Sequence, residues 1–324
     1  MKKVLFTIVL FCLLGAVSHA ASEKSMALVS VSVTDMKSEP DYQSETISQA
    51  VMGTPVEVTG KHGYWYSIVT PEGYSGWTTE LNIALLSDER FEQWKSASRY
   101  IVTDYFTVVR EDPHEQARVI SDCVMGNIVE AWAAGEGNDG YVPVMLPDGR
   151  AGYIGRHSVK SMSGWLSSVE SPSGEDIVAT AGMFLGFPYL WGGLSPKGLD
   201  CSGLVKMSYF MNGIILLRDA RQQINTGTAL DFTDILGNLR SGDLVFFGRP
   251  AADGGPGSVT HVGIYMSDGM MIHSSLRVRI NSLLPGRQDS YTNKSIVGAV
   301  RILGNQNAGP GIVTVAGHPW YFND

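Results

Sequence analysis

The amino-acid sequence predicts a multidomain protein in which two small antiparallel β-barrels precede an α+β domain. Three observations support this prediction: one segment occurs twice, both copies consist of short strands separated by Gly, Pro and Asp, and the pattern changes after Val159 to helical runs followed by strands. Short strands with regular turn signals are typical of small barrels, and helices segregated from strands are typical of an α+β domain.

Length and composition agree with a protein of two or three domains. The 324 residues exceed the size of one ordinary domain, and a hydrophobic content of 44% with 17% charged residues is typical of a globular chain. The formal charge of −8 disfavours nucleic acid as a partner, because that partner requires a basic surface.

The first twenty residues have the pattern of a secretory signal peptide. Lys2 and Lys3 precede an apolar run from Val4 to Val17, and small residues lead up to Ala20. The run is short for a transmembrane helix. We therefore expect residues 1–20 to be removed and the protein to be exported, to the periplasm or the medium, with no membrane span.

The two barrels are predicted from an internal repeat. The heptapeptide ISQAVMG at Ile47 recurs as ISDCVMG at Ile120, and the turn PEGYSGW at Pro71 recurs as PDGRAGY at Pro147. Two copies are too few for a solenoid. In their strand pattern and in the P-x-G-x-x-G-aromatic ending, both copies resemble bacterial SH3-like domains. The expected boundaries are residues 27–84 and 100–160.

The repeat also distinguishes core positions from specialised ones. Cys123 occupies the position of Ala50, so we expect a small buried residue there and no disulfide. Tyr74 occupies the position of Arg150, so the barrel itself does not require tyrosine. We therefore expect Tyr74 to be exposed and to serve the adjacent domain.

Helices and strands follow in a predictable order. Residues 87–100 are expected to contain a short helix, and Ser173 and Asp176 have the spacing of a capping box before a helix that runs to Leu185. A second helix begins at Cys201. Strands are expected at residues 243–248, 261–266, 270–275 and 296–302, within a domain of residues 170–304. The tail, residues 305–324, has no assignable role, and His318 is expected at the surface.

One short segment carries the chemistry. Asp200-Cys201-Ser202-Gly203 follows the glycine-rich Y-x-W-G-G stretch and opens a predicted helix, so the Cys201 sulfur would lie at the helix N-terminus. The helix dipole stabilises a thiolate there by only about 0.3–2 kcal/mol. A histidine partner has to supply the rest of the decrease in pKa. We therefore expect Cys201 to be a nucleophile, and its backbone N–H to be an oxyanion donor.

Two of the histidines are placed to assist the thiol. His62, His114 and His157 lie in repeat segments or turns and are expected at the surface. The strands at residues 261–266 and 270–275 would form a hairpin. A two-residue turn of Asp268 and Gly269 would put His261 and His273 on opposite faces of it, whereas a three-residue loop that also includes Ser267 puts them on one face. We favour the three-residue loop, with His261 as base and His273 as the orienting third member.

These motifs together resemble the NlpC-type cell-wall peptidases, a papain-like cysteine peptidase family. With two SH3-like domains ahead, the architecture is similar to that of the γ-D-glutamyl-L-diamino acid endopeptidases of the dipeptidyl peptidase VI type. The resemblance implies hydrolysis of the γ-D-Glu–diamino acid bond in murein peptides with a free N-terminal L-Ala, without a metal or other cofactor. It leaves open whether the diamino acid is diaminopimelate or lysine.

The resemblance also implies roles for individual residues. Tyr189 would complete the oxyanion site, and the residues on the substrate side would be Tyr74, Trp191, Asp200 and Ser202. Tyr189 has an alternative role as a core aromatic, and Asp200 as a helix N-cap. The family's R-D-x-x-Q-Q stretch is matched at Arg218, but Ala220 and Arg221 stand where a serine is often found.

Two other functions remain compatible with the sequence. An amidase or acyltransferase would use the same cysteine and histidine, with an amine instead of water as the acceptor. A non-catalytic wall-binding protein would depend on the SH3-like pair alone, but it would not need Cys201, His261 and His273.

Overall fold

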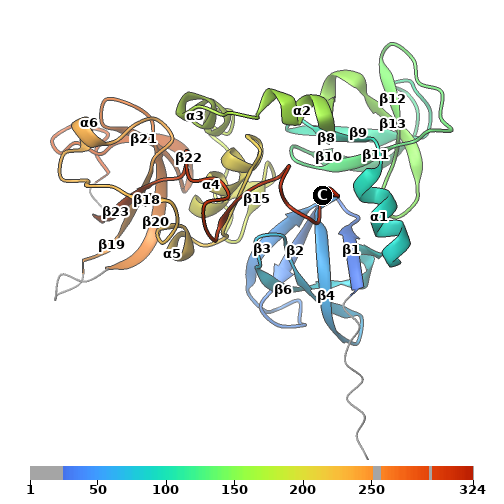
Figure 1. Cartoon of the computed structure of the whole chain (residues 1–324), viewed down its shortest axis with the longest axis horizontal. Coiled ribbons are helices and arrows are strands. Elements are labelled where there is room, and N and C mark those ends of the chain that lie inside the picture. The colour runs from blue at the N-terminus through green and yellow to red at the C-terminus, as the bar shows by residue number, and fades with distance from the viewer. Residues whose placement is uncertain (1–24, 251–256, 292–293, 324) are drawn as a thin grey trace, which may run out of the picture.

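The computed structural model describes residues 25–250, 257–291 and 294–323, so the predicted signal peptide lies outside the described part of the chain. Three lobes are visible in Figure 1, with the first sheet at the lower right, the second above it and the third lobe at the left. Among the described residues, no helix is both long and apolar enough to cross a membrane.

The first lobe is a seven-stranded antiparallel sheet. Its strands pair in the order β3-β2-β6-β5-β4-β1-β7. Val29, Met36 and Ile68 are among the side chains that fill its core. The strands are β1 Ser25–Val29, β2 Val33–Lys37, β3 Thr46–Val51, β4 Pro55–His62, β5 Trp65–Val69, β6 Ser75–Thr79 and β7 Ile83–Leu85.

The second lobe repeats this topology strand for strand. Its order is β10-β9-β13-β12-β11-β8-β14, so each strand has the same neighbours as the corresponding strand of the first sheet. Cys123 is fully buried in its core as a free thiol, so the expectation of a small buried position is confirmed. The strands are β8 Arg99–Val102, β9 Phe106–Arg110, β10 Val119–Val124, β11 Ile128–Ala131, β12 Tyr141–Met145, β13 Ala151–Gly155 and β14 Val159–Ser161.

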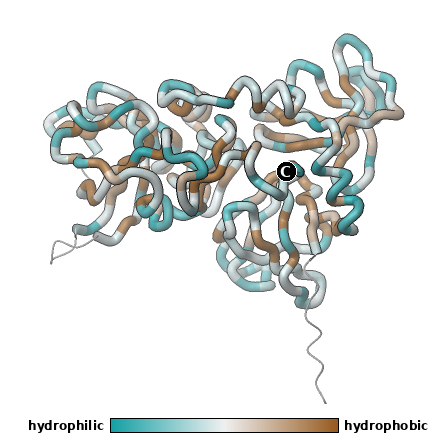
Figure 2. Tube along the Cα trace, viewed as in Figure 1, coloured by the Kyte–Doolittle hydropathy of each residue, from teal (hydrophilic) through white to brown (hydrophobic). Residues whose placement is uncertain are grey.

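Short helices connect the lobes. Helix α1, Asp88–Ser96, is the one expected between the two sheets; its N-cap Ser87 accepts a hydrogen bond from the Arg90 backbone, and Phe91 and Trp94 are buried. Figure 2 shows that most of the helix is hydrophilic. Helix α2, Met162–Ser168, leads from the second sheet toward the third lobe.

The third lobe packs helices against a six-stranded sheet of order β18-β23-β19-β20-β21-β22. Helix α3, Gly174–Gly182, has the predicted capping box between Ser173 and Asp176. The elements that follow are β15 Leu194–Ser195, β16 Gly198–Leu199, α4 Cys201–Phe210, β17 Ile214–Leu216, α5 Ala220–Gln223, β18 Thr228–Ala229, α6 Ile235–Asn238, β19 Leu244–Arg249, β20 Ser258–Tyr265, β21 Met270–Ser275, β22 Arg277–Ser282, β23 Ser295–Arg301 and β24 Ile312–Thr314.

The position of α4 determines where the site forms. Leu204 and Val205 of α4 belong to the same buried cluster as Val262 and Ile264 of β20. The helix therefore lies against the middle of the sheet, with its N-terminus beside the strand that carries His261. That strand begins at Ser258, earlier than predicted, so His261 lies within it and not at its start.

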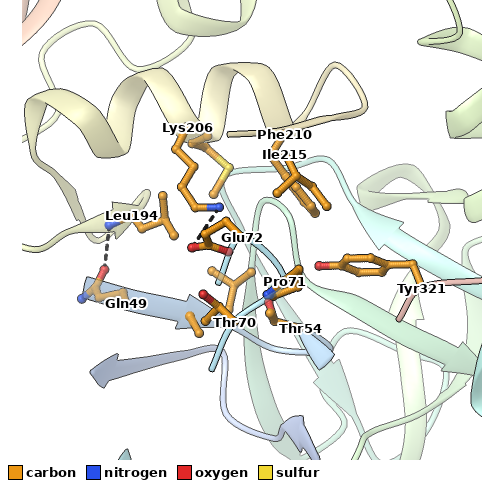
Figure 3. A pocket seen from close by; sticks show the side chains of 13 residues that line it. Gln49, Thr54, Thr70, Pro71, Glu72, Leu194, Lys206, Phe210, Ile215 and Tyr321 are labelled. Carbon is orange, nitrogen blue, oxygen red and sulfur yellow. Dashed lines mark hydrogen bonds and ion pairs between the residues drawn. The ribbon is translucent and has the colours of Figure 1, made fainter. Parts of the chain in front are cut away.

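Polar contacts join the first lobe to α4. Lys206 and Glu72 form a buried ion pair at 3.2 Å, and the Leu194 backbone N–H donates to Gln49 (Figure 3). Removing either charge would leave the other one buried without a partner, which typically costs about 3–5 kcal/mol. These buried contacts therefore fix the position of the first lobe relative to the third.

The C-terminal tail belongs to the same interface. Tyr321 is buried, and its carbonyl accepts a hydrogen bond from the Arg99 guanidinium at 2.7 Å. Figure 3 shows its ring beside Pro71 and Thr54. His318 is also buried, with its Nε2 3.0 Å from the Pro71 carbonyl. The expectation of a surface position for His318 was therefore wrong, because the tail is packed between lobes.

Candidate active site

Cys201 is the first residue of α4, as predicted. Asp200 is the N-cap, and its Oδ1 accepts a hydrogen bond from the Gly203 backbone at 2.6 Å. The buried Arg218 guanidinium forms an ion pair with the same carboxylate, 2.6 Å from its Oδ2, and also donates to Ser202 Oγ. The N-cap role of Asp200 is confirmed, and its carboxylate is well supplied with donors.

The hairpin that carries the two histidines has the predicted register. Ile264 pairs with Ile272, which places Gly263 opposite His273. The turn differs in detail from the prediction, because Asp268 and Gly269 both have positive φ and the Met270 backbone N–H donates to Ser267. This is a type I′ turn. Ser267 is the extra residue, and it forms a bulge just before the turn, because the Met266 backbone N–H also donates to the Met270 carbonyl.

The histidines form a hydrogen-bonded chain with a defined direction. His261 Nε2 lies 2.6 Å from His273 Nδ1, and His273 Nε2 lies 2.8 Å from Asn281 Oδ1. The Asn281 amide nitrogen donates to the Asp289 carbonyl, so Oδ1 is the atom turned to His273. Because that oxygen only accepts, His273 Nε2 carries its proton and His273 Nδ1 accepts from His261. A neutral His261 is then left with an unprotonated Nδ1.

Burial holds both reacting groups in their neutral forms. It raises the pKa of the Cys201 thiol to about 11, and it lowers the pKa of His261 to about 3. A backbone hydrogen bond from Val262, the residue after His261, partly offsets the effect on Cys201. We expected the helix terminus and the histidine to lower the thiol pKa, but desolvation outweighs the backbone hydrogen bonds that favour the thiolate.

A cleft of about 490 Å³ opens at Cys201 and is walled by both the first and the third lobe. Every residue predicted for oxyanion or substrate binding lines it, whereas His261 and His273 are buried and are not part of its lining. The lining residues are Glu45, Ile47, Tyr74, Tyr189, Trp191, Asp200, Cys201, Ser202, Asp219, Ala220, Arg221, Val259 and Thr260.

Three aromatic side chains are held at this cleft. The Trp191 indole is 60% exposed and donates to Glu45 Oε1 at 2.7 Å, which connects the two lobes. Tyr74 is not exposed as expected but half-buried, because it packs against the core of the first lobe. Its hydroxyl lies 3.5 Å from Asp219 Oδ1, and burial raises its pKa to about 12. Tyr189 has no hydrogen-bond partner for its hydroxyl within the described residues, and burial, then the charge of Cys201, raises its pKa.

The sequence interpretation missed several polar residues of the site. Asn281 lies on β22, a strand that was not predicted although its V-R-I-N-S run alternates apolar and polar residues. Glu45 and Asp219 bring two carboxylates into the cleft, and no local pattern marks Glu45. The Tyr291 ring packs 4.8 Å from His273 and 5.4 Å from His261, and it was missed because it lies in a loop.

A thiol at a helix N-terminus beside a buried, directionally bonded histidine pair defines the class of cysteine peptidases. The NlpC/P60 family model matches residues 186–301, and the Bacterial SH3 domain model matches residues 32–80. The chain belongs to the NlpC/P60 family.

The chain is similar to proteins of the same architecture along most of its length. "Gamma-D-glutamyl-L-lysine dipeptidyl-peptidase" of Bacillus cereus is 31% identical over 79% of this chain and 75% of that relative. "Dipeptidyl-peptidase 6" of Lysinibacillus sphaericus is 29% identical over 85% of this chain and 99% of the relative. A solved NlpC/P60 family protein from Bacillus cereus superimposes with a TM-score of 0.68 and 26% identity, covering 86% of this chain and 100% of that chain.

Proposed function

We propose that this protein is an exported cysteine peptidase that hydrolyses the γ-D-Glu–diamino acid bond of murein peptides with a free N-terminal L-Ala. The observation that carries the proposal is the cleft shared by the catalytic lobe and the first lobe. It is lined by Cys201 and Asp219 of the third lobe and by Glu45 and Tyr74 of the first lobe. The relatives named above as dipeptidyl-peptidases support the reaction class.

The site residues divide the chemistry between them. Cys201 attacks the γ-carbonyl as its proton passes to the free Nδ1 of His261, since neither group is ionised beforehand. His273 then stabilises the imidazolium through Nδ1 and keeps the base in one tautomer. The backbone N–H of Cys201 and the Tyr189 hydroxyl donate to the oxyanion. His261 gives its proton to the leaving amine, which leaves the acyl fragment bound to Cys201 as a thioester. Water then hydrolyses the thioester and releases L-Ala-γ-D-Glu, with the water's proton returning to the thiol.

The substrate's free amine is held at the closed end of the cleft. Asp219 suits this role because its carboxylate is half-buried and already accepts a hydrogen bond from Tyr74. Glu45 and Trp191 form the adjacent wall. Asp200 and Ser202 support the same end, although the Asp200 charge is largely neutralised by Arg218. A peptide still attached to glycan at its N-terminus would not fit this end.

We extend the SH3-like assignment to residues 100–160. Supporting this, the second sheet has the strand order of the first, which is the one that the bacterial SH3 model matches. The division into residues 27–84, 100–160 and 170–304 is proposed on the same basis. Export is proposed from the sequence of residues 1–20.

Mass spectrometry of a defined peptide tests this function. L-Ala-γ-D-Glu-diamino acid peptides, with either diaminopimelate or lysine, are incubated with the purified protein and the products are weighed. We expect release of L-Ala-γ-D-Glu, with none from Cys201→Ala at an unchanged melting temperature. Transfer of the acyl group to an added amine instead of water would favour an acyltransferase. No cleavage of either peptide would contradict the proposal.

A further inference from the structure

Arg221 is a cation that lines the cleft and forms no ion pair with any residue that the structure describes. It lies in α5, it is exposed, and it lines both the cleft at Cys201 and the adjoining hollow beside Val259 and Ile224. Its Nε donates to the Val259 carbonyl at 3.3 Å, which holds the guanidinium against the cleft wall. Its terminal nitrogens form no salt bridge within the described ranges, so they are available to a ligand.

The charges of the cleft match those of a γ-linked dipeptide. Of its lining residues, Glu45, Asp200, Asp219 and Arg221 are charged, and Asp200 is paired with the buried Arg218 beneath it. Two carboxylates and one guanidinium remain. A peptide with a free amine and a γ-linked glutamate presents one cation and one anion, because the γ-linkage leaves the glutamate α-carboxylate free. Burial raises the pKa of Asp219, and the nearby positive charges of Arg218 and, more weakly, Arg221 act against that rise.

We propose that Arg221 binds the α-carboxylate of the γ-linked glutamate and makes the enzyme select free-acid peptides over those in which this carboxylate is amidated. The proposal rests on the proposed function. A guanidinium offers donors in a planar fork that matches both oxygens of a carboxylate. A carboxamide has one oxygen, no charge, and an amino group that cannot bond to a guanidinium.

Matched peptides test the selection. The purified chain and its Arg221→Gln variant are given L-Ala-γ-D-Glu-diamino acid and the same peptide with the glutamate α-carboxamide, and kcat/KM is measured for each. We expect the native chain to favour the acid by about ten- to hundredfold, the range for a charged hydrogen bond. In Arg221→Gln, kcat/KM for the acid falls by a similar factor and the ratio between the peptides approaches one. Arg221→Glu reverses the preference.

Arg240→Gln is the matched control, since Arg240 is exposed in the same lobe and lines none of the described cavities. This variant also removes one positive charge, and it should keep the native ratio of kcat/KM between the acid and the amidated peptide. The inference alone is overturned if the native chain cleaves both peptides equally, or if Arg221→Gln lowers both activities by the same factor. If the native chain cleaves neither peptide, the proposed function fails and the inference fails with it.

Discussion

At the scale of single residues, the direction of the histidine chain determines which nitrogen would act as the base in the proposed mechanism. Asn281 accepts from His273, so His273 must accept from His261, and the Nδ1 of His261 is left free. The roles therefore follow from one amide that is itself fixed by the Asp289 carbonyl. His273 is fully buried and is a positioning residue.

Replacing His273 separates positioning from packing. His273→Ala removes the acceptor for His261 Nε2, so kcat should fall by roughly 10²–10⁴, the usual contribution of a positioned base. His273→Asn retains an acceptor oxygen and should lose less, with a similar KM. Steady-state kinetics and the pH profile of kcat distinguish them. Equal activity of Asn, Ala and native chains would make His273 purely structural.

The same two histidines predict an acid-sensitive fold. Burial lowers the pKa of His261 to about 3 and that of His273 to about 4, from an ordinary 6.5. Protons therefore bind the unfolded chain first, so stability is complete above pH 6.5 and decreases as the pH falls toward the folded values. The slope is at most about 1.4 kcal/mol per pH unit for each histidine. Urea unfolding at several pH values should show a shallower slope for His261→Gln; an unchanged slope would contradict burial of the neutral imidazole.

At the scale of elements, the loop before α4 is shaped by contact with the first sheet. Gly192 has φ +76°, and a Cβ there would lie 2.6 Å from the Thr46 carbonyl of β3. The glycine of the W-G-G stretch thus serves an interface between lobes as well as a turn. A side chain at this position would force the loop that carries Trp191 away from Glu45.

Gly192→Ala should therefore reduce kcat/KM well beyond the cost of backbone strain. Gly286→Ala is the matched control, because Gly286 has φ +84° with nothing near its Cβ direction. Both variants incur the left-handed penalty of roughly 1 kcal/mol, and only the first moves the cleft wall. Kinetics and melting curves of the two variants make the comparison. Equal activities would show that the approach to Thr46 is unimportant.

Elements with a strong local signal were predicted well, and those formed by distant contacts were not. The capping box of α3, the hairpin register and the Cys201 helix follow from neighbouring residues. The type I′ turn with its bulge preserved the register that a three-residue loop would give. By contrast, Glu45 meets Trp191 only after the first lobe docks on the third. No local pattern could reveal such a pairing.

At the scale of the whole molecule, the cleft at Cys201 does not belong to one lobe. Glu45 and Tyr74 come from the first lobe, and Cys201 comes from the third lobe. The buried Glu72–Lys206 pair and the packed tail hold these lobes in one arrangement (Figure 3). The sequence repeat predicted the two sheets. The packing of the tail between the lobes, by contrast, became visible only in the structure.

The closed end of the cleft is the central claim, and N-acetylation tests it most directly. kcat/KM is measured for L-Ala-γ-D-Glu-diamino acid with a free and with an acetylated amine, for the native chain, Tyr74→Ala and Arg150→Ala. Arg150 occupies the sister position in the second sheet and lines none of the described cavities, so its variant should match the native chain. We predict that the native chain strongly prefers the peptide with a free amine. Tyr74→Ala should raise KM for that peptide by an amount worth about 1–3 kcal/mol and should reduce the preference over the acetylated peptide. Equal cleavage of both peptides by the native chain would contradict the account.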